Sequence, residues 1–302
     1  MIVTTPPGER ELMRSQNRGS RTYHIGGRAY PSVTTIVSQG EPKPALVGWA
    51  KKVTAETAVD QHDLIGKLIQ ADGPQAAIDH LKGAGYRKRN AAGDIGSRLH
   101  EVAEWEILNG KPFPDPGDAE ARALLAQFRH FVHHAQPEWE AVEAIVYNET
   151  HLYAGTLDAI ARLHIPGLPS DGLTLLDWKS GSGVYGSYAL QLAAYAHAEY
   201  LIGPGGPQEM PTVRWAAVVH ITTQGWRLVE MDISHEVWEA FLSCRDMAAW
   251  VEMSSGAVGK TLAHGQAAAE AFTLPPLSRA PATAAAPVEE FAARRRIKPP
   301  AL

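Results

Sequence analysis

The sequence predicts an α/β fold, in which a central mixed β-sheet is flanked by helices and preceded by a mainly helical N-terminal region. Two observations carry this prediction. Residues 142–147, 153–163 and 173–179 form apolar, strand-like runs that follow one another with turn residues between them. Residues 94–109 and 187–201, on either side, carry apolar side chains at helical spacing. Strand-like runs enclosed by helical runs indicate a sheet covered by helices.

The third strand-like run ends on Asp177-Trp178-Lys179. Because side chains alternate along a strand, Asp177 and Lys179 share one face and Trp178 takes the other. A carboxylate can hold a hard divalent cation, and an ammonium can orient water or stabilise charge on a phosphoryl oxygen. The alternative is an exposed strand face with a weak ion pair. The apolar residues before this motif, and Gly181 and Gly183 after it, favour a ligand site.

Two further acidic residues lie in the preceding strand-like runs. Asp158 is expected on the face of Thr156, opposite Leu157 and Ala159. Glu143 lies in the first run, and an acidic residue in a half-buried strand needs a partner there. Both carboxylates are therefore candidates for a metal site.

A predicted helix over residues 94–109 adds a nitrogen ligand. Asp94 is expected to cap its start and Gly110 to end it. Gly96, His100 and Glu104 follow one another at i+4 steps and lie along one line of the helix. Gly96 would permit a close backbone approach, and His100 would add an imidazole. The alternative is that His100 and Glu104 form a surface pair on a solvated face.

The next predicted helix, over residues 187–201, places Tyr188, Gln191 and Tyr195 on one side. A Gln amide both donates and accepts hydrogen bonds, and a phenol combines an apolar ring with a polar tip. These side chains suit contact with a nucleic-acid backbone, or support of Lys179. The alternative is a helix packed on the sheet with its polar tips in water.

In this order the motifs resemble those of the PD-(D/E)XK nuclease superfamily, and within it the RecB-like branch that includes phage exonucleases. The resemblance covers residues 94–200, and residues 30–49 are similar to openings of phage members. It implies a restriction-endonuclease-like core. The matching positions are a helical His, a Gly-x-x-Asp strand, an Asp-x-Lys strand and a Gln-x-x-x-Tyr helix, here His100, Asp158, Asp177, Lys179, Gln191 and Tyr195.

The resemblance also implies roles. His100, Asp158 and Asp177 would ligate Mg²⁺ or Mn²⁺, together with the main-chain carbonyl of Trp178, and Lys179 would position the attacking water. Glu104 and Glu143 would bind a second ion or the water around the first. Gln191 and Tyr195 would complete the catalytic group. Clustered carboxylates repel one another, so they favour a bound cation.

The implied activity is metal-dependent hydrolysis of DNA phosphodiester bonds, as an exonuclease that processes ends in recombination, repair or phage replication. A structure-specific endonuclease and a non-catalytic DNA-binding protein on a nuclease scaffold are the alternatives. DNA is the expected partner. A recombinase or a single-strand-binding protein is a further candidate partner, and an oligomer is compatible with the sequence.

Cysteine content separates the chain from the iron–sulfur members of the branch, which hold their cluster with four cysteines. Cys244 is the single cysteine, so an iron–sulfur cluster and an internal disulfide are both excluded. Cys244 is expected to be a small buried residue. A cytoplasmic location follows as an expectation. Membrane association is not expected, because no apolar run is long enough for a span and no signal-peptide pattern opens the chain.

Three segments are expected: residues 1–93 as an N-terminal loop and helical region, 94–272 as the core, and 273–302 as a disordered Pro/Ala-rich tail. Residues 1–29 are predicted to be loop-like, with a hairpin turn at Gly26-Gly27. The net charge of −5 is unusual for a DNA-binding protein. Basic residues at 51–52, 87–89 and Arg98 form a candidate DNA path, with surface solubility as the alternative.

Overall fold

The computed structural model describes residues 2–17, 20–167 and 171–262, without the side chains of residues 91, 92, 94 and 95. The chain divides into two compact units, residues 1–257 and 258–302. The helices and strands below belong to the first unit. The tail expected at 273–302 lies outside the described residues. None of the helices in the described part of the chain combines the length and apolar composition that a membrane span needs.

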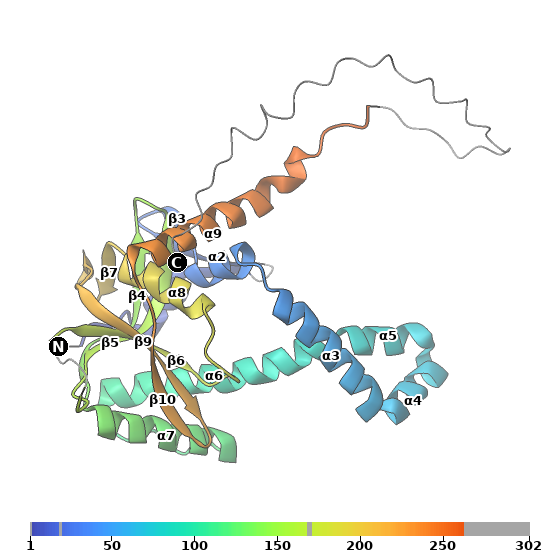
Figure 1. Cartoon of the computed structure of the whole chain (residues 1–302), viewed down its shortest axis with the longest axis horizontal. Helices are drawn as coiled ribbons and strands as arrows, with labels where there is room; N and C mark the ends of the chain where they lie inside the picture. The colour runs from blue at the N-terminus through green and yellow to red at the C-terminus, as the bar shows by residue number, and fades with distance from the viewer. Residues whose placement is uncertain (1, 18–19, 168–170, 263–302) are drawn as a thin grey trace, which may run out of the picture. The chain divides into compact units, whose positions relative to one another are not determined.

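A seven-stranded mixed sheet forms the centre of the first unit (Figure 1), which confirms the predicted α/β fold class. Its strand order is β10-β9-β6-β5-β4-β7-β8. The pairing of β6 with β9 is parallel, and the other pairings are antiparallel. The strands are β4 (Glu138–Asn148), β5 (Tyr153–Arg162), β6 (Leu173–Lys179), β7 (Tyr200–Gly203), β8 (Gly206–Glu209), β9 (Val213–Thr222) and β10 (Gly225–Glu230).

Helices cover both faces of this sheet and create two cores. On one face, α6 (Ala84–Asn109) and α7 (Ala119–Ala135) form what we call the α6/α7 core. On the other, α2 (Val33–Gly40), α8 (Ser187–Ala196) and α9 (His235–Met253) form the α8/α9 core. Trp178 is buried in the α6/α7 core against Phe128 and Phe131, so Asp177 and Lys179 take the opposite face as predicted.

The strand pair β4–β5 departs from regular alternation at its two acidic residues. Val142 packs in the α6/α7 core and Ala144 in the α8/α9 core, although residues two apart in a strand normally share a face. Glu143, between them, has a φ of 47°, in the left-handed region that non-glycine residues rarely adopt. The strand therefore changes face at Glu143.

The partner strand changes face at the same level. Leu157 packs in the α8/α9 core and Ala159 in the α6/α7 core. The expectation that both lie opposite Asp158 is therefore wrong, because the ladder distorts where Asp158 passes Glu143. A distortion of this kind, next to a candidate site, aims side chains that a regular strand would point elsewhere.

The first 31 residues are more ordered than a loop. They form α1 (Pro7–Met13) and a small sheet of β1 (Arg14–Asn17), β2 (Ser20–Ile25) and β3 (Arg28–Pro31). The predicted turn at Gly26-Gly27 is confirmed between β2 and β3, with both glycines at positive φ. Ahead of α1, Val3 exchanges hydrogen bonds with β4: its N–H donates to the Glu140 carbonyl (2.8 Å), and its carbonyl accepts from Val142 (2.9 Å). This segment covers the free edge of β4.

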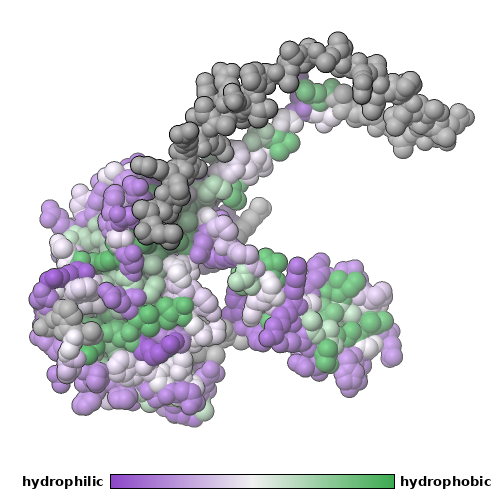
Figure 2. Space-filling model, in the orientation of Figure 1, coloured by the Kyte–Doolittle hydropathy of each residue, from purple (hydrophilic) through white to green (hydrophobic). Residues whose placement is uncertain are grey.

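The N-terminal helical region contains α3 (Pro44–Asp60), α4 (His62–Asp72) and α5 (Pro74–Lys82), with a break at Gly73-Pro74. Figure 2 shows apolar surface over these helices. The helix that follows, α6, begins at Ala84, so Asp94 lies inside it and does not cap it. The expected boundary between residues 93 and 94 thus falls within one continuous helix. Gly110 ends the helix in the left-handed conformation, as predicted.

One later helix ends before its predicted limit, and strand β7 follows it. The helix predicted over 187–201 stops at Ala196, and Leu201 belongs to β7. The reason is that the edge of β4 at residues 145–147 pairs with the chain after Ala196. Glu199 donates its N–H to the Tyr147 carbonyl (3.0 Å), and strand pairing replaces the helix. Asp118 caps α7 by accepting a hydrogen bond from the N–H of Ala121 (2.7 Å).

Candidate metal centre

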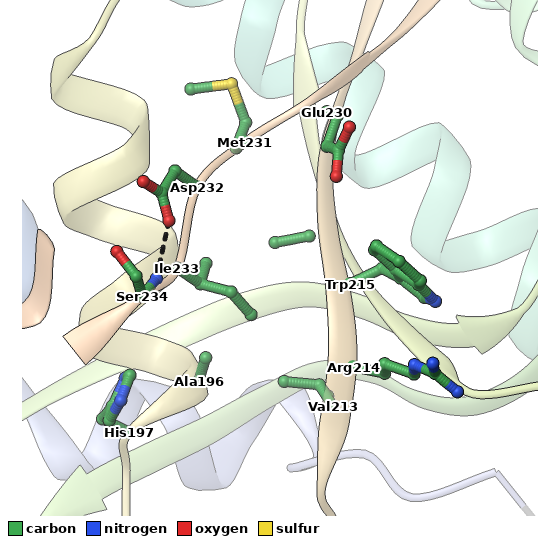
Figure 3. A pocket seen from close by; sticks show the side chains of 11 residues that line it. Ala196, His197, Val213, Arg214, Trp215, Glu230, Met231, Asp232, Ile233 and Ser234 are labelled. Atoms are coloured by element: carbon green, nitrogen blue, oxygen red, sulfur yellow. Dashed lines mark hydrogen bonds between the residues drawn. The ribbon is translucent and has the colours of Figure 1, made fainter. Parts of the chain in front are cut away.

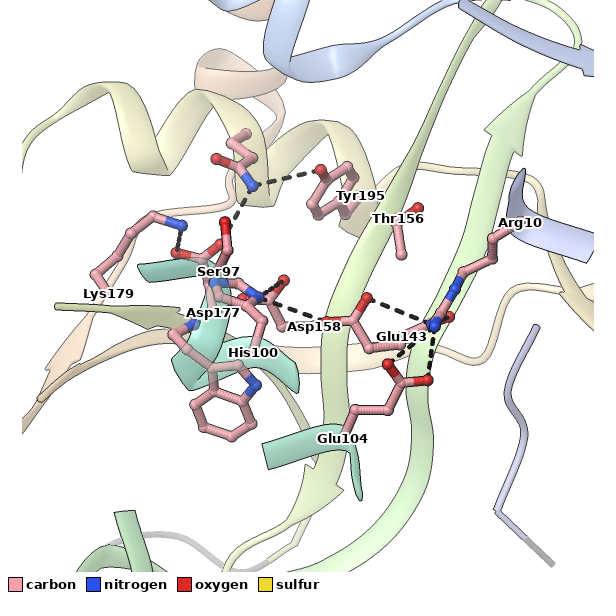
Figure 4. A network of polar contacts seen from close by, with 12 residues as sticks. Arg10, Ser97, His100, Glu104, Glu143, Thr156, Asp158, Asp177, Lys179 and Tyr195 are labelled. Atoms are coloured by element: carbon pink, nitrogen blue, oxygen red, sulfur yellow. Dashed lines mark hydrogen bonds and ion pairs between the residues drawn. The ribbon is translucent and has the colours of Figure 1, made fainter. Parts of the chain in front are cut away.

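Three potential metal ligands meet where β4, β5 and α6 approach one another (Figure 4). Nδ1 of His100 lies 3.4 Å from Oε1 of Glu143 and 3.4 Å from Oδ1 of Asp158. One ligand atom from each residue lies within 4.8 Å of the other two. Three segments that are distant in sequence therefore deliver one imidazole and two carboxylates to a single point.

The donor set and its spacing fit a divalent cation. Adjacent ligands of an octahedral Mg²⁺ or Mn²⁺ lie about 3 Å apart, because metal–oxygen distances are about 2.1 Å. The observed 3.4 Å separations are close to that value. Glu143 reaches the site from a residue at positive φ, a conformation that costs on the order of 1–3 kcal/mol and that clusters at ligand sites. The residues present thus fit the ion that the sequence implied.

Asp177 lies beside this group but is not one of its three members. Only 1% of Asp177 is exposed, and its Oδ2 atom lies 2.5 Å from Nζ of Lys179. Its Oδ1 atom accepts a hydrogen bond from Nε2 of Gln191 (3.2 Å). The resemblance implied Asp177 as a ligand and Glu143 in a supporting role; in the structure Glu143 belongs to the three-residue group, and the Asp177 carboxylate lies against Lys179. The reason is that Lys179, two residues along the same strand face, reaches the Asp177 carboxylate.

Asp158 is held in place by the neighbouring strand. It is 7% exposed, and its Oδ2 atom accepts a hydrogen bond from the main-chain N–H of Trp178 (2.7 Å). Its other oxygen, Oδ1, is the one that faces His100. The ligating atom is thereby oriented by main chain, as supporting hydrogen bonds do in metal sites. Ligation by the Trp178 carbonyl stays a prediction.

Electrostatic coupling shifts the titration of the ligands. Burial by itself lowers the pKa of His100, but the charges and hydrogen bonds of Asp158 and Glu143 outweigh it and raise that pKa well above 6.5. The pKa of Glu143 is raised, chiefly by burial. Burial opposes ionisation of Asp158 too, but His100, Lys179 and the Trp178 N–H together lower its pKa. A metal ion that binds His100 would therefore compete with a proton for that nitrogen.

The Asp177–Lys179 pair behaves differently. Burial, with a contribution from the Asp158 charge, raises the pKa of Asp177 to about 6 despite the opposing charge of Lys179. Burial lowers the pKa of Lys179, but the charges of Asp177 and Asp158 outweigh it and raise that pKa. Lys179 is a cation at neutral pH, so it can donate hydrogen bonds or balance negative charge, but it cannot accept a proton.

Helix α8 supports the pair from the α8/α9 core. Gln191 connects Asp177 to the hydroxyl of Tyr195, which lies 3.3 Å from the Gln191 amide nitrogen. The Tyr188 ring lies 5.0 Å from Nζ of Lys179, within cation–π range. Of the three side chains predicted on this face, Tyr188 lies near Lys179, whereas Gln191 and Tyr195 reach Asp177. Tyr195 itself is buried, over the Cα of Gly155.

Arg10, on α1, completes the group and was not predicted. Its Nη2 atom contacts both carboxylate oxygens of Glu104, at 2.7 and 2.9 Å. Its Nη1 atom donates to the main-chain carbonyl of Glu143 (2.8 Å) and lies 3.5 Å from Oε2 of the same residue. No motif marks Arg10 in the sequence, because its position depends on the pairing of residues 3–5 with β4.

Two expectations have less support in the structure: the close backbone approach at Gly96 and the DNA path along the basic residues. A Cβ built on Gly96 would lie 3.6 Å from Oγ of Ser180, an ordinary contact that does not require glycine. Four of the six basic residues of the candidate DNA path have acidic or carbonyl partners within the chain. Lys52 and Lys88 both pair with Glu56, Arg98 pairs with Asp118, and Arg87 donates to the His80 carbonyl (2.9 Å).

A separate open cavity of about 450 Å³ lies between α8, the start of β9 and the β10–α9 connection (Figure 3). It shares no residue with the metal centre. The Asp232 carboxylate on its wall accepts a hydrogen bond from the N–H of Ser234 (2.8 Å), a local turn interaction. Its lining includes Ala196, His197, Val213, Arg214, Glu230 and Asp232.

Comparison with known proteins does not identify the chain: no family model and no curated protein matches it. The class to which it is assigned therefore depends on the site described above.

Proposed function

We propose that this protein is a metal-dependent DNA nuclease of the PD-(D/E)XK type, with exonuclease action on DNA ends as the preferred form. One observation carries the proposal. His100, Glu143 and Asp158 converge to within 4.8 Å, and the ion pair of Asp177 and Lys179 lies directly beside them. These five side chains come from four elements, so their meeting is a product of the fold. The superfamily assignment itself stays a proposal, supported by the order of the motifs.

The site contains the parts that phosphodiester hydrolysis needs. Mg²⁺ or Mn²⁺, when bound, supplies Lewis-acid stabilisation of phosphoryl oxygens and a water of lowered pKa. Lys179, kept cationic by its neighbours, would orient that water or balance charge on the phosphoryl group. Gln191 and Tyr195 would hold the Asp177 carboxylate in a fixed position. Asp158 would present one oxygen to the ion while the Trp178 N–H fixes the other.

The Lys179→Ala variant tests the proposal. We expect cleavage of linear DNA to fall by about 10²–10³-fold, because charge stabilisation at the reacting phosphate is lost. Fold and DNA binding should remain. Activity is measured on single- and double-stranded DNA labelled at either end, with Mg²⁺, with Mn²⁺ and with chelator. Lys82→Ala is the matched control, since it removes a lysine that pairs with an aspartate on the exposed surface.

The same assay separates the alternatives. Normal turnover by Lys179→Ala would reject the mechanism. Cleavage of closed circular DNA would indicate a structure-specific endonuclease. Binding without cleavage under each metal condition would favour a non-catalytic protein on a nuclease scaffold. Recombinases and single-strand-binding proteins stay proposed partners, to be tested by their effect on cleavage of the labelled ends.

A further inference from the structure

Arg10 occupies the side of the centre that faces away from His100 and Asp158 (Figure 4). We infer that its guanidinium takes the place of a second divalent cation, so that this centre holds a single metal ion. The inference rests on the proposed metal centre and specifies its composition. Two-metal nucleases hold their ions about 3.5–4 Å apart with carboxylates between them, and here one of the two positions is filled by a side chain of the protein.

Glu143 is the carboxylate that both positions share. Its Oε1 atom faces His100, at 3.4 Å from Nδ1. Its Oε2 atom faces Arg10, at 3.5 Å from Nη1. In a two-metal site such a carboxylate would bridge two ions. Here it bridges the proposed ion and a guanidinium.

Glu104 is the carboxylate that a second ion would need. Both of its oxygens are already bound by Nη2 of Arg10, and its side chain is only 17% exposed. The Arg10 side chain is 11% exposed, and its guanidinium also donates to the Glu143 carbonyl. A second ion would have to displace Arg10 from three acceptors and leave a buried cation beside another cation, which is strongly unfavourable.

The fold keeps Arg10 in this position. The segment before α1 pairs with β4 at Val3, and Oγ1 of Thr5 accepts from the N–H of Ile145 (2.9 Å) and donates to the Ile202 carbonyl (2.6 Å). These contacts lie on both sides of Glu143 along β4. Arg10 is thus anchored through the main chain as well as through its side chain.

Counting Mn²⁺ ions bound to the whole protein tests the inference without any substrate. Equilibrium dialysis and electron paramagnetic resonance of the wild-type protein should give one ion per chain, with no spectrum of coupled pairs. Two ions would overturn the inference and leave the nuclease proposal standing. No bound ion would remove the metal centre itself, and the inference with it.

The variant Arg10→Met should open the second position. We expect two ions per chain and the coupled spectrum of ions about 3.5–4 Å apart. Arg129→Met is the matched control. Arg129, on α7, binds Glu106 of α6 through its Nε and Nη2 atoms and lies outside the centre. This control should keep one ion. An unchanged count of one in folded Arg10→Met would overturn the inference.

A second variant covers the case in which Arg10→Met folds poorly. In Arg10→Met/Glu104→Gln the unpaired buried carboxylate is removed together with the guanidinium, so the fold should persist. This double variant should bind one ion, because the second position lacks its carboxylate. Two ions in the double variant would contradict the assignment of Glu104 to the second position.

Discussion

At the residue scale, a glycine beside the centre leaves no space for a side chain next to an aromatic ring. A Cβ built on Gly155 would lie 2.4 Å from Cε1 of Tyr195. Tyr195 is 2% exposed and cannot swing aside freely. Its hydroxyl contacts Gln191, which in turn donates to Asp177. The glycine of the Gly-x-x-Asp pattern thus makes room for the tyrosine of the Gln-x-x-x-Tyr pattern.

Gly155→Ala should therefore disturb the centre without touching a ligand. We expect a loss of about 1–3 kcal/mol in the free energy of unfolding, as for other overpacked cores, and a fall in DNA cleavage as Gln191 loses its partner. Denaturant unfolding and the end-label assay measure both effects. Gly225→Ala, which meets no atom within 4 Å, is the control.

A compensating change distinguishes positioning from general damage. Gly155→Ala/Tyr195→Leu should recover stability, because the smaller side chain gives the new methyl group room, but it should not recover cleavage. Recovery of both would show that the tyrosine hydroxyl has no part in holding Asp177.

The sequence identified most of the individual site residues, and the errors have physical causes. Asp158, Asp177, Lys179 and His100 were found because strand alternation and helix spacing bring side chains to one face. Which of Asp177 and Glu143 joins the three-residue group could not be predicted, since it depends on the left-handed backbone at Glu143. Arg10 was missed because its partners lie 94 and 133 residues further along the chain.

At the element scale, α2 and α9 cross at a glycine. A Cβ on Gly40 would lie 2.1 Å from the carbonyl oxygen and 2.6 Å from the Cα of Cys244, and these are main-chain atoms that cannot move independently. Cys244 itself is half-buried and packs against the α8/α9 core, so the expectation of a small buried residue is met in part. The feature that stabilises this crossing is the close approach of the Gly40 and Cys244 main chains, and the thiol has no part in it.

Gly40→Ala should separate the two helices and lower the free energy of unfolding by about 1–3 kcal/mol. Gly48→Ala provides a control with the opposite sign, because Gly48 lies inside α3 with no atom within 4 Å of its Cβ. Alanine in a helix interior is favoured over glycine by up to about 1 kcal/mol. Urea unfolding of both variants measures the difference. Equal stabilities would contradict the proposed crossing.

The elements that the sequence predicted well are those with strong local patterns, namely β4, β5 and β6. The start of α6 was placed ten residues late, because helix-forming residues before Asp94 continue without a break from Ala84. The end of α8 was placed too late for the opposite reason, since pairing with β4 overrides the helical pattern after Ala196. Strand β7 and the ordered N-terminal segment were not predicted, because both form through tertiary contacts with β4.

At the scale of the whole molecule, the centre links stability to pH. Asp177, whose pKa is about 6 in the folded protein against an ordinary value of 3.8, favours folding most when it is protonated. That contribution is lost as pH rises from about 4 to about 6. His100, with its pKa raised well above 6.5, loses its contribution at higher pH, as pH rises through the folded pKa. Asp158 has a lowered pKa, so its contribution is lost only below about pH 4.

The metal-free protein should therefore melt at a lower temperature at pH 8 than at pH 5. Mn²⁺ should raise the melting temperature strongly at pH 8 and little at pH 5, because protons compete for the same atoms. Thermal unfolding with chelator and with Mn²⁺ across this range measures the effect. In His100→Asn the fall in melting temperature above pH 6.5 should be smaller than in the wild-type protein. A metal effect that is independent of pH would argue against the assigned ligands.

The change of face at Glu143 and Asp158 has a consequence for how β4 and β5 find their alignment. In a regular strand pair, a slip of two residues keeps each side chain on its original face. Here a slip of two residues would move residues of one strand past the point where the strands change face. Side chains that pack in the α6/α7 core would then point into the α8/α9 core, and the reverse. The irregularity that aims two carboxylates at one point thus also selects a single register, so that misaligned sheets are penalised by the same two positions.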